Sequence, residues 1–120
     1  NRQVASELNA AGVSVRWCNT QGEQCHNKML MKSNATQAEL ILGSANFTAR
    51  NLKNYNLETN LRVVGKMQDT VFQDAQHYFN TAWSNLEGKN MSVDYAVYAD
   101  ESKWKYAVYR FMEWSGLSTF

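Results

Sequence analysis

Two neighbouring runs of strand-forming residues constrain the fold of this chain most strongly. The first run covers residues 26–32, and the second covers residues 38–47, which include three consecutive large aliphatic side chains. The polar stretch 33–37 between them has the composition of a turn. The sequence therefore predicts a β-hairpin built from residues 26–47.

Side chains alternate between the two faces of a strand, so residues two apart point the same way. His26 and Lys28 then share one face of the first strand, and Ser44 and Asn46 share a face at the end of the second. Gly43 lacks a Cβ and allows the backbone to approach a ligand or neighbouring strand closely. The hairpin can gather an imidazole, an ammonium, a hydroxyl and an amide around one small volume.

This set of groups suits a phosphodiester substrate. An imidazole can attack phosphorus, and a lysine ammonium can neutralise the non-bridging oxygens. Hydroxyl and amide groups can donate hydrogen bonds to the same oxygens. Such a site needs no metal ion and no cofactor, and we expect neither.

The spacing of these residues resembles the signature of the phospholipase D superfamily, H-x-K-x4-D-x6-G-S-x-N. The matching positions are His26, Lys28, Gly43, Ser44 and Asn46. A lone H-x-K would carry almost no information, but several pieces in the right order are specific. The resemblance covers about residues 10–87.

The resemblance implies an α/β fold with a mixed β-sheet flanked by helices, one lobe of the phospholipase D-like fold. It also implies an acidic residue after the signature that hydrogen-bonds the nucleophilic histidine, and Glu58 stands at that place. The segment from Phe79 to Trp83 resembles the helix that follows in the family. The implied catalytic residues are His26, Lys28, Asn46 and Glu58, and the implied substrate-binding residues are Gly43 and Ser44.

The activity implied is phosphodiester hydrolysis or phosphatidyl transfer, as in phospholipase D and cardiolipin synthase, through a phosphohistidine. The substrate would be a phospholipid or another phosphodiester, with contact to a membrane surface. The family uses a second copy of the motif, and this chain has no second His-x-Lys. We therefore expect the second half to come from the same parent chain or from a homodimer.

The sequence departs from the family pattern in the turn of the hairpin. Ser33 stands where the family has aspartate, and the interval from Ser33 to Gly43 is three residues longer than the pattern. Insertions in turns are tolerated, and neither change removes a group expected to touch phosphate. Ser33 nevertheless favours a second interpretation, a degenerate lobe without catalytic activity.

Composition constrains the class of protein further. The 120 residues are 44% hydrophobic and 19% charged, with a formal charge of +1, as expected for one globular domain. This near-neutral charge argues against a superfamily nuclease working as a homodimer, because nucleic-acid binding usually needs a basic face. No apolar run is long enough for a transmembrane helix. We expect residues 1–120 to form a single catalytic lobe cut from a longer chain that begins before Asn1.

Cys18 and Cys25 flank a polar loop that joins a predicted strand, residues 13–17, to His26. A disulfide closing this loop would indicate a secreted or membrane-associated protein. Two free thiols would fit a cytoplasmic one. Two cysteines alone do not decide between these two states.

Helical and strand periodicity predicts the remaining elements. We expect a helix ending near Gly12, a strand over 57–64 ended by Gly65, and a helix over 67–87. Residues 88–120 form a C-terminal extension ending in an aromatic-rich helix, for which Asp100 is a suitable N-cap. Aromatic stripes at helical spacing are usually buried, so core packing against the sheet is favoured over contact with lipid or a partner.

Overall fold

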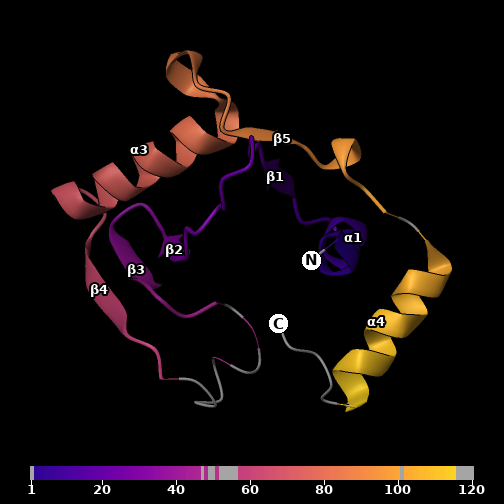
Figure 1. The fold of residues 1–120 in the computed structure, drawn as a ribbon. Helices are drawn as coiled ribbons and strands as arrows, with labels where there is room; N and C mark the ends of the chain where they lie inside the picture. Colours follow the sequence, from indigo (N-terminus) through magenta and orange to yellow (C-terminus); the bar gives the residue numbers. More distant parts are fainter. Residues whose placement is uncertain (1, 47, 49–50, 52–56, 101, 116–120) are drawn as a thin grey trace.

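The computed structural model describes residues 2–46, 48, 51, 57–100 and 102–115. The helices are α1 (Arg2–Ala10), α3 (Thr70–Ser84) and α4 (Lys103–Ser115), with short 3₁₀ helices η1 (Leu86–Gly88) and η2 (Tyr95–Val97). The strands are β1 (Arg16–Cys18), β2 (Met29–Ser33), β3 (Gln37–Gly43), β4 (Asn60–Lys66) and β5 (Ser92–Asp94). Figure 1 shows an open arch, with α3 and β2 to β4 on one limb and α1 and α4 on the other.

The α/β class expected from the sequence is confirmed. In place of the expected mixed sheet, the described strands form two antiparallel sheets, one of β2, β3 and β4 and one of β1 and β5. Neighbouring strands in the larger sheet follow one another along the chain, and such connections favour antiparallel pairing. The α3 connection after β4 leads to β5, which pairs with β1 instead of joining the larger sheet.

The hairpin turn between β2 and β3 is confirmed. The Asn34 side-chain oxygen accepts hydrogen bonds from the backbone N–H groups of Thr36 at 2.9 Å and Gln37 at 2.8 Å. An asparagine that bonds its own following backbone in this way is a common turn former. The first strand begins at Met29, so the expectation that His26 and Lys28 belong to it is wrong.

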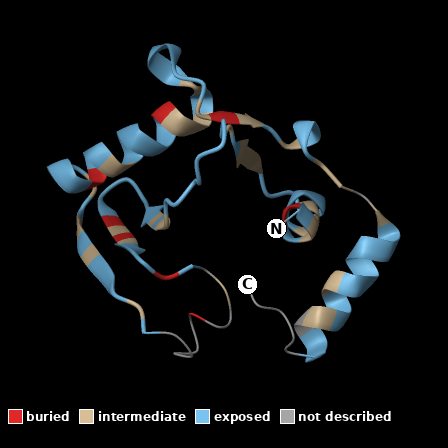
Figure 2. Cartoon of the chain, viewed as in Figure 1, coloured by how far each residue is buried: buried red, intermediate tan, exposed pale blue. Residues whose placement is uncertain are grey.

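The core lies between α3 and one face of the larger sheet. Phe72 on α3 is 1% exposed and packs with Ala38 and Leu40 of β3. Gly65 does not end β4 as expected, because it lies inside the strand, where a Cβ would come within 3.0 Å of the Phe72 ring. A glycine here lets the helix approach the sheet closely. Figure 2 shows the buried residues confined to small patches, one of them on β3.

Asn85 ends α3, and its side chain connects β5 to the end of this helix through hydrogen bonds. Asn85 has a left-handed backbone, φ 53°, and its N–H bonds back to the Thr81 carbonyl. Its side-chain oxygen accepts hydrogen bonds from the N–H groups of Met91 at 2.8 Å and Ser92 at 2.9 Å, while its amide donates to the Ser92 carbonyl at 2.8 Å. The helix is therefore shorter than the expected 67–87, and the sequence analysis did not anticipate β5.

A disulfide joins Cys18 at the end of β1 to Cys25, the residue before His26. This observation decides between the disulfide and the two free thiols that the sequence left open. The smaller sheet and the segment that leads into β2 are thus covalently linked.

The expectation that the aromatic-rich helix packs into the core against the sheet is wrong. The helix α4 contacts α1, and Arg110 lies 3.6 Å from the Glu7 carboxylate. Several of its large side chains remain exposed, Trp104 by 68% and Trp114 by 82%. Helical spacing shows that the apolar side chains share one face of the helix, but it does not specify which part of the protein, if any, covers that face. No helix in the parts of the chain that the structure describes is long and apolar enough to cross a membrane.

The chain exposes more surface than a self-contained domain of its size. Its accessible surface is 9140 Å², whereas a globular monomer of this mass exposes about 6,600 Å². Among the residues that the structure describes, the buried apolar ones are few, namely Ala5, Ala38, Leu40, Ala45 and Phe72. The difference is roughly 2,500 Å² on this chain alone, which corresponds to about 5,000 Å² over two partners, as in large permanent interfaces.

We expect acid to loosen the start of α4. The Lys105 ammonium, 2.7 Å from Asp100, and then the Ser102 N–H hold the pKa of the Asp100 carboxyl below its usual value. A lowered folded-state pKa stabilises the fold above the unfolded pKa of about 4, and that contribution is lost as the pH falls through the folded value. The protection factors of the α4 amides, which compare the observed exchange rate with the intrinsic rate at each pH, should fall as the pH is lowered from about 6 to about 2.5. The Asp100→Asn variant should lose that pH dependence, and an unchanged profile would contradict the assignment.

Candidate active site

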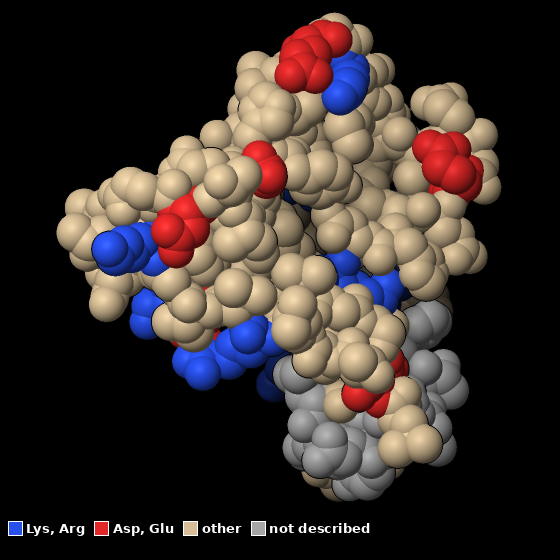
Figure 3. Space-filling model, turned by 90° about the vertical axis from the view of Figure 1, so that its left-hand side faces the viewer, with Lys and Arg blue, Asp and Glu red and all other residues tan. Residues whose placement is uncertain are grey.

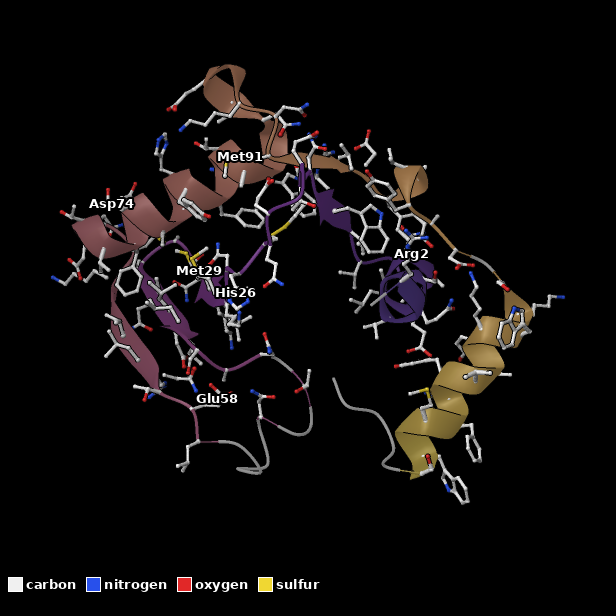
Figure 4. The ribbon with its side chains drawn as sticks, viewed as in Figure 1. Arg2, His26, Met29, Glu58, Asp74 and Met91 are labelled. Carbon is white, nitrogen blue, oxygen red and sulfur yellow. A yellow bond between two sulfur atoms is a disulfide. The ribbon has the colours of Figure 1, made fainter. Side chains whose placement is uncertain are left out.

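The residues predicted to form the site emerge at one end of the larger sheet. Met29 at the start of β2 lies opposite Leu42, and Gly43 at the end of β3 lies opposite Asn60 at the start of β4. The start of β2, the end of β3 and the start of β4 therefore share one end. In Figure 4, His26 lies beside β2 and Glu58 lies at this same end of the sheet.

His26 and Lys28 lie directly before β2 and contact each other. The Lys28 ammonium is 3.2 Å from His26 Nδ1 and donates to the His26 backbone carbonyl at 3.1 Å. An ammonium has no acceptor, so this contact makes Nδ1 the acceptor and leaves the proton of the neutral ring on Nε2. The His26 side chain is exposed and Lys28 is half-buried.

Ser44 and Glu58 form a second pair. The Ser44 hydroxyl donates to the Glu58 carboxylate at 2.6 Å and accepts from the Thr59 N–H at 3.0 Å. The Ser44 N–H also donates to the Thr59 carbonyl at 3.0 Å. These bonds join the end of β3 to the residues that lead into β4.

Asn51 supports Glu58, and the sequence analysis did not identify it. Its amide donates to the other Glu58 carboxylate oxygen, while its own oxygen accepts from the Thr48 hydroxyl at 2.8 Å. Asn51 is 9% exposed, and a buried amide needs such partners. The signal in the sequence was a polar residue followed seven positions later by the acidic one, which is too weak to stand alone.

Gly43 is required by the backbone opposite it. A Cβ at this position would lie 2.3 Å from the Thr59 carbonyl oxygen and 2.7 Å from Asn60 Cα. Asn46 has an exposed side chain, and its carbonyl accepts from the Thr48 N–H at 2.8 Å. The amide of Asn46 is thus available to a ligand at the end of β3.

The structure brings the predicted residues together as two pairs. No hydrogen bond within the described part of the chain joins His26 to Glu58, the contact that the family resemblance implied. Glu58 instead hydrogen-bonds Ser44 and Asn51.

A cavity of about 540 Å³ lies elsewhere, between α1, η2 and α4, and its lining contains none of the predicted site residues.

Ser33, which replaces the family aspartate, lies at the opposite end of the hairpin. It is the last residue of β2 and pairs with Ala38 beside the turn, whereas His26 precedes the first residue of the strand. The departure from the family pattern therefore lies away from the candidate phosphate-binding groups.

Basic side chains occur on the outer side of the larger sheet. Arg62 hydrogen-bonds Glu39 at 2.5 Å, and this bond, helped by the charge of Lys32, holds the pKa of the Glu39 carboxyl below its usual value. Figure 3, which looks onto the side of α3 and β4, shows lysine and arginine side chains gathered along part of this face. Three more cations in the sequence could attract a phosphate. Arg50 and Lys53 lie outside the described residues, and Arg16 pairs with Asp94.

Comparison with known families identifies the lobe. The family described as cardiolipin synthase, PLD-like domain, matches residues 1–83. The chain belongs to this family. Its place in the phospholipase D superfamily, whose members carry out phosphodiester cleavage and phosphatidyl transfer, is confirmed. Neither the curated proteins nor the solved structures gave a match.

We expect Asn51→Ala to destabilise the protein through Glu58. The substitution removes one of the carboxylate's donors, and a lost hydrogen bond to a charged group costs about 1.5–3 kcal/mol. Denaturant unfolding of the full-length protein measures this cost. The matched control is Asn46→Ala, since Asn46 is exposed and its side chain makes no described hydrogen bond. Equal losses in the two variants would show that the bond to Glu58 contributes nothing.

Proposed function

We propose that this chain provides one half of an active site for phosphodiester hydrolysis or phosphatidyl transfer through a phosphohistidine. The observation that carries this proposal is the placement of two hydrogen-bonded pairs at one end of one sheet. The first pair is His26 with Lys28, and the second is Ser44 with Glu58. Membership of the phospholipase D-like family supports the same chemistry.

The first step would be attack by a ring nitrogen of His26 on phosphorus. In the free site, the Lys28 ammonium contacts His26 Nδ1. The oxygens of a bound phosphodiester would compete with Nδ1 for this ammonium. Once Lys28 moves to those oxygens, the ring proton can shift to Nδ1. The Nδ1–H group can then donate a hydrogen bond to a carboxylate, which leaves Nε2 unprotonated and free to attack. Glu58 is the carboxylate we assign to this role.

Charge would then develop on the oxygens of the transferring group. Lys28, the Ser44 hydroxyl and the Asn46 amide are the donors that stabilise this charge. Because Ser44 already donates to Glu58 at 2.6 Å, substrate binding would exchange that bond for one to phosphate. Glu58 would then be released toward His26, so the two pairs would rearrange together.

The leaving oxygen requires a proton donor, and the same group must later deprotonate the water or alcohol that attacks the phosphohistidine. A second His-x-Lys half, from the parent chain or from a second copy, would supply it. The large exposed surface of 9140 Å² supports such a partner, since a second lobe would cover part of it.

The substrate we propose is a phospholipid or a similar phosphodiester, met at a membrane surface. We also propose that the protein works in an oxidising compartment, outside the cytoplasm. Disulfides persist in such compartments, and the exposed Cys18–Cys25 bond would otherwise be open to reduction.

The test is to trap the intermediate. The full-length protein is mixed with a chromogenic phosphodiester, quenched in base, and digested for mass spectrometry. The chromogenic alcohol leaves, so the group expected on His26 is the phosphoryl group still esterified to the substrate's other alcohol. Absence of this group from His26 during active turnover would contradict the proposed nucleophile. Robust turnover by this 120-residue chain as a monomer would contradict the need for a second half.

One rival function has a specific observation in its favour. Ser33 replaces the family aspartate, as a non-catalytic lobe that only completes the fold would allow. A phosphorylated His26 would exclude this rival. A nuclease would be favoured instead by salt-dependent DNA binding at submicromolar affinity.

A further inference from the structure

The segment that carries His26 and Lys28 has few attachments to the rest of the molecule. It connects β1, which ends at Cys18, to β2, which begins at Met29. Within the described chain, the hydrogen bonds of residues 20–28 all stay inside the segment. They join the Gln21 N–H to Glu23 at 2.8 Å, and Lys28 to His26.

The disulfide is therefore the main anchor of this segment on its N-terminal side. Cys25 directly precedes His26 and is bonded to Cys18. On the C-terminal side, the segment is fixed where Met29 enters the sheet opposite Leu42. Between these two points lie only residues 26–28, which include the His26–Lys28 pair of the candidate site.

The anchor itself is firmly held. Cys18 pairs with Ser92 across the smaller sheet, and the Ser92 hydroxyl donates to the Ala82 carbonyl of α3 at 2.6 Å. The Arg16 side chain donates to the same hydroxyl at 3.0 Å. The disulfide thus connects His26 to the end of the helix that packs on the larger sheet.

We propose that the Cys18–Cys25 disulfide is a positioning element for His26 and Lys28, and that its reduction disables the site while leaving the fold in place. Reduction would turn a short span tethered at both ends into a connection of residues 19–28 without a described bond from 20–28 to the rest of the chain. The effect on activity rests on the proposed function. The effect on the segment does not.

The reduction needs an external dithiol, which supplies both electrons. A reagent thiolate attacks one cysteine sulfur, the protein S–S bond breaks, and a mixed disulfide forms. The second reagent thiolate attacks that mixed disulfide and closes a cyclic reagent disulfide. The reagent is oxidised by two electrons, and the two protein thiolates take up two protons to become thiols. Both cysteines are exposed and accessible to the reagent.

The expected effect is mainly on kcat. Misplacement of a reacting group by about 1 Å can cost roughly 10²-fold in rate. The groups at the end of β3 and in the second half remain in place and still bind substrate. We therefore expect dithiothreitol to lower kcat by about 10- to 100-fold, with a smaller change in KM.

The experiment compares the full-length wild type with a Cys18→Ser, Cys25→Ser double variant, each with and without dithiothreitol. The wild type should lose kcat on reduction, and the double variant should be slow throughout and insensitive to the reagent. A wild type and double variant with equal kcat would overturn the proposal.

A second readout does not depend on activity. Limited trypsin digestion of the same samples measures cleavage after Lys28, with cleavage after Arg62 in β4 as the internal control. Reduction should speed cleavage at Lys28 several-fold and leave Arg62 unchanged. This result without any phosphodiesterase activity would defeat the proposed function but support the positioning role. Unchanged cleavage at Lys28, or equal acceleration at both sites, would overturn the positioning role.

Discussion

His26→Ala is expected to abolish turnover by the full-length protein on a chromogenic phosphodiester, because it removes the proposed nucleophile. The His26 side chain is exposed, and its described contact is with Lys28, so the midpoint of thermal unfolding should change little. The matched control is His77→Ala on α3, an exposed histidine 3.4 Å from the Glu87 carboxylate, which should keep full activity.

Lys28→Ala should act on the same reaction in a different way. It leaves the nucleophile but removes a positive charge from the transition state, which typically costs about 10²–10³ in rate. Phosphorylated His26 should therefore remain detectable in Lys28→Ala and be absent in His26→Ala. Added divalent metal should rescue neither variant, because the proposed site uses side-chain donors. A His26→Ala protein that retains most of its rate would show that the mechanism is wrong.

The hairpin and the location of the candidate residues could be predicted because both depend largely on local sequence. Alternating side chains and the Asn34 turn set the register of β2 against β3, and this register brings the start of β2 to the end of β3. The family signature then identified the residues at that end. These features require no knowledge of contacts between distant parts of the chain.

The position of His26 outside the strand could not be predicted from the alternation of side chains. Alternation predicts a strand that begins three residues too early, because His26 and Lys28 continue the spacing of β2 without joining its hydrogen-bonded ladder. A disulfide, not strand pairing, restrains this stretch. Two cysteines in a sequence leave that constraint undetermined.

Contacts between distant elements account for the other differences. The strand β5 has three residues and is defined by pairing with β1 far earlier in the chain, from Arg16↔Asp94 to Cys18↔Ser92. The partners of Glu58 likewise depend on how the end of β3 meets the residues before β4. The exposed aromatic face of α4 shows the same limit, since periodicity does not specify the surface that covers a helix.

Gly43→Ala is expected to damage the site more than the fold. The new Cβ would lie 2.3 Å from the Thr59 carbonyl, and backbone cannot move aside as a side-chain tip can. The ends of β3 and β4 must separate, which breaks the paired bonds between Ser44 and Thr59 and displaces Glu58. Overpacking of this kind costs about 1–3 kcal/mol in stability. The displacement of Ser44 and Glu58 should lower kcat by a further factor of about 10².

The matched control is Gly65→Ala, the same substitution at the other end of β4. Its Cβ would lie 2.7 Å from the Asp69 carboxylate, a side-chain tip that can rotate, and 3.0 Å from the Phe72 ring. We expect this variant to lose stability in the core while its kcat stays near that of the wild type at a temperature where both are folded. Denaturant unfolding and steady-state kinetics on both variants separate the two effects. If Gly43→Ala keeps its rate, or if both variants lose rate in proportion to stability, then the junction of β3 and β4 does not set the geometry of the site.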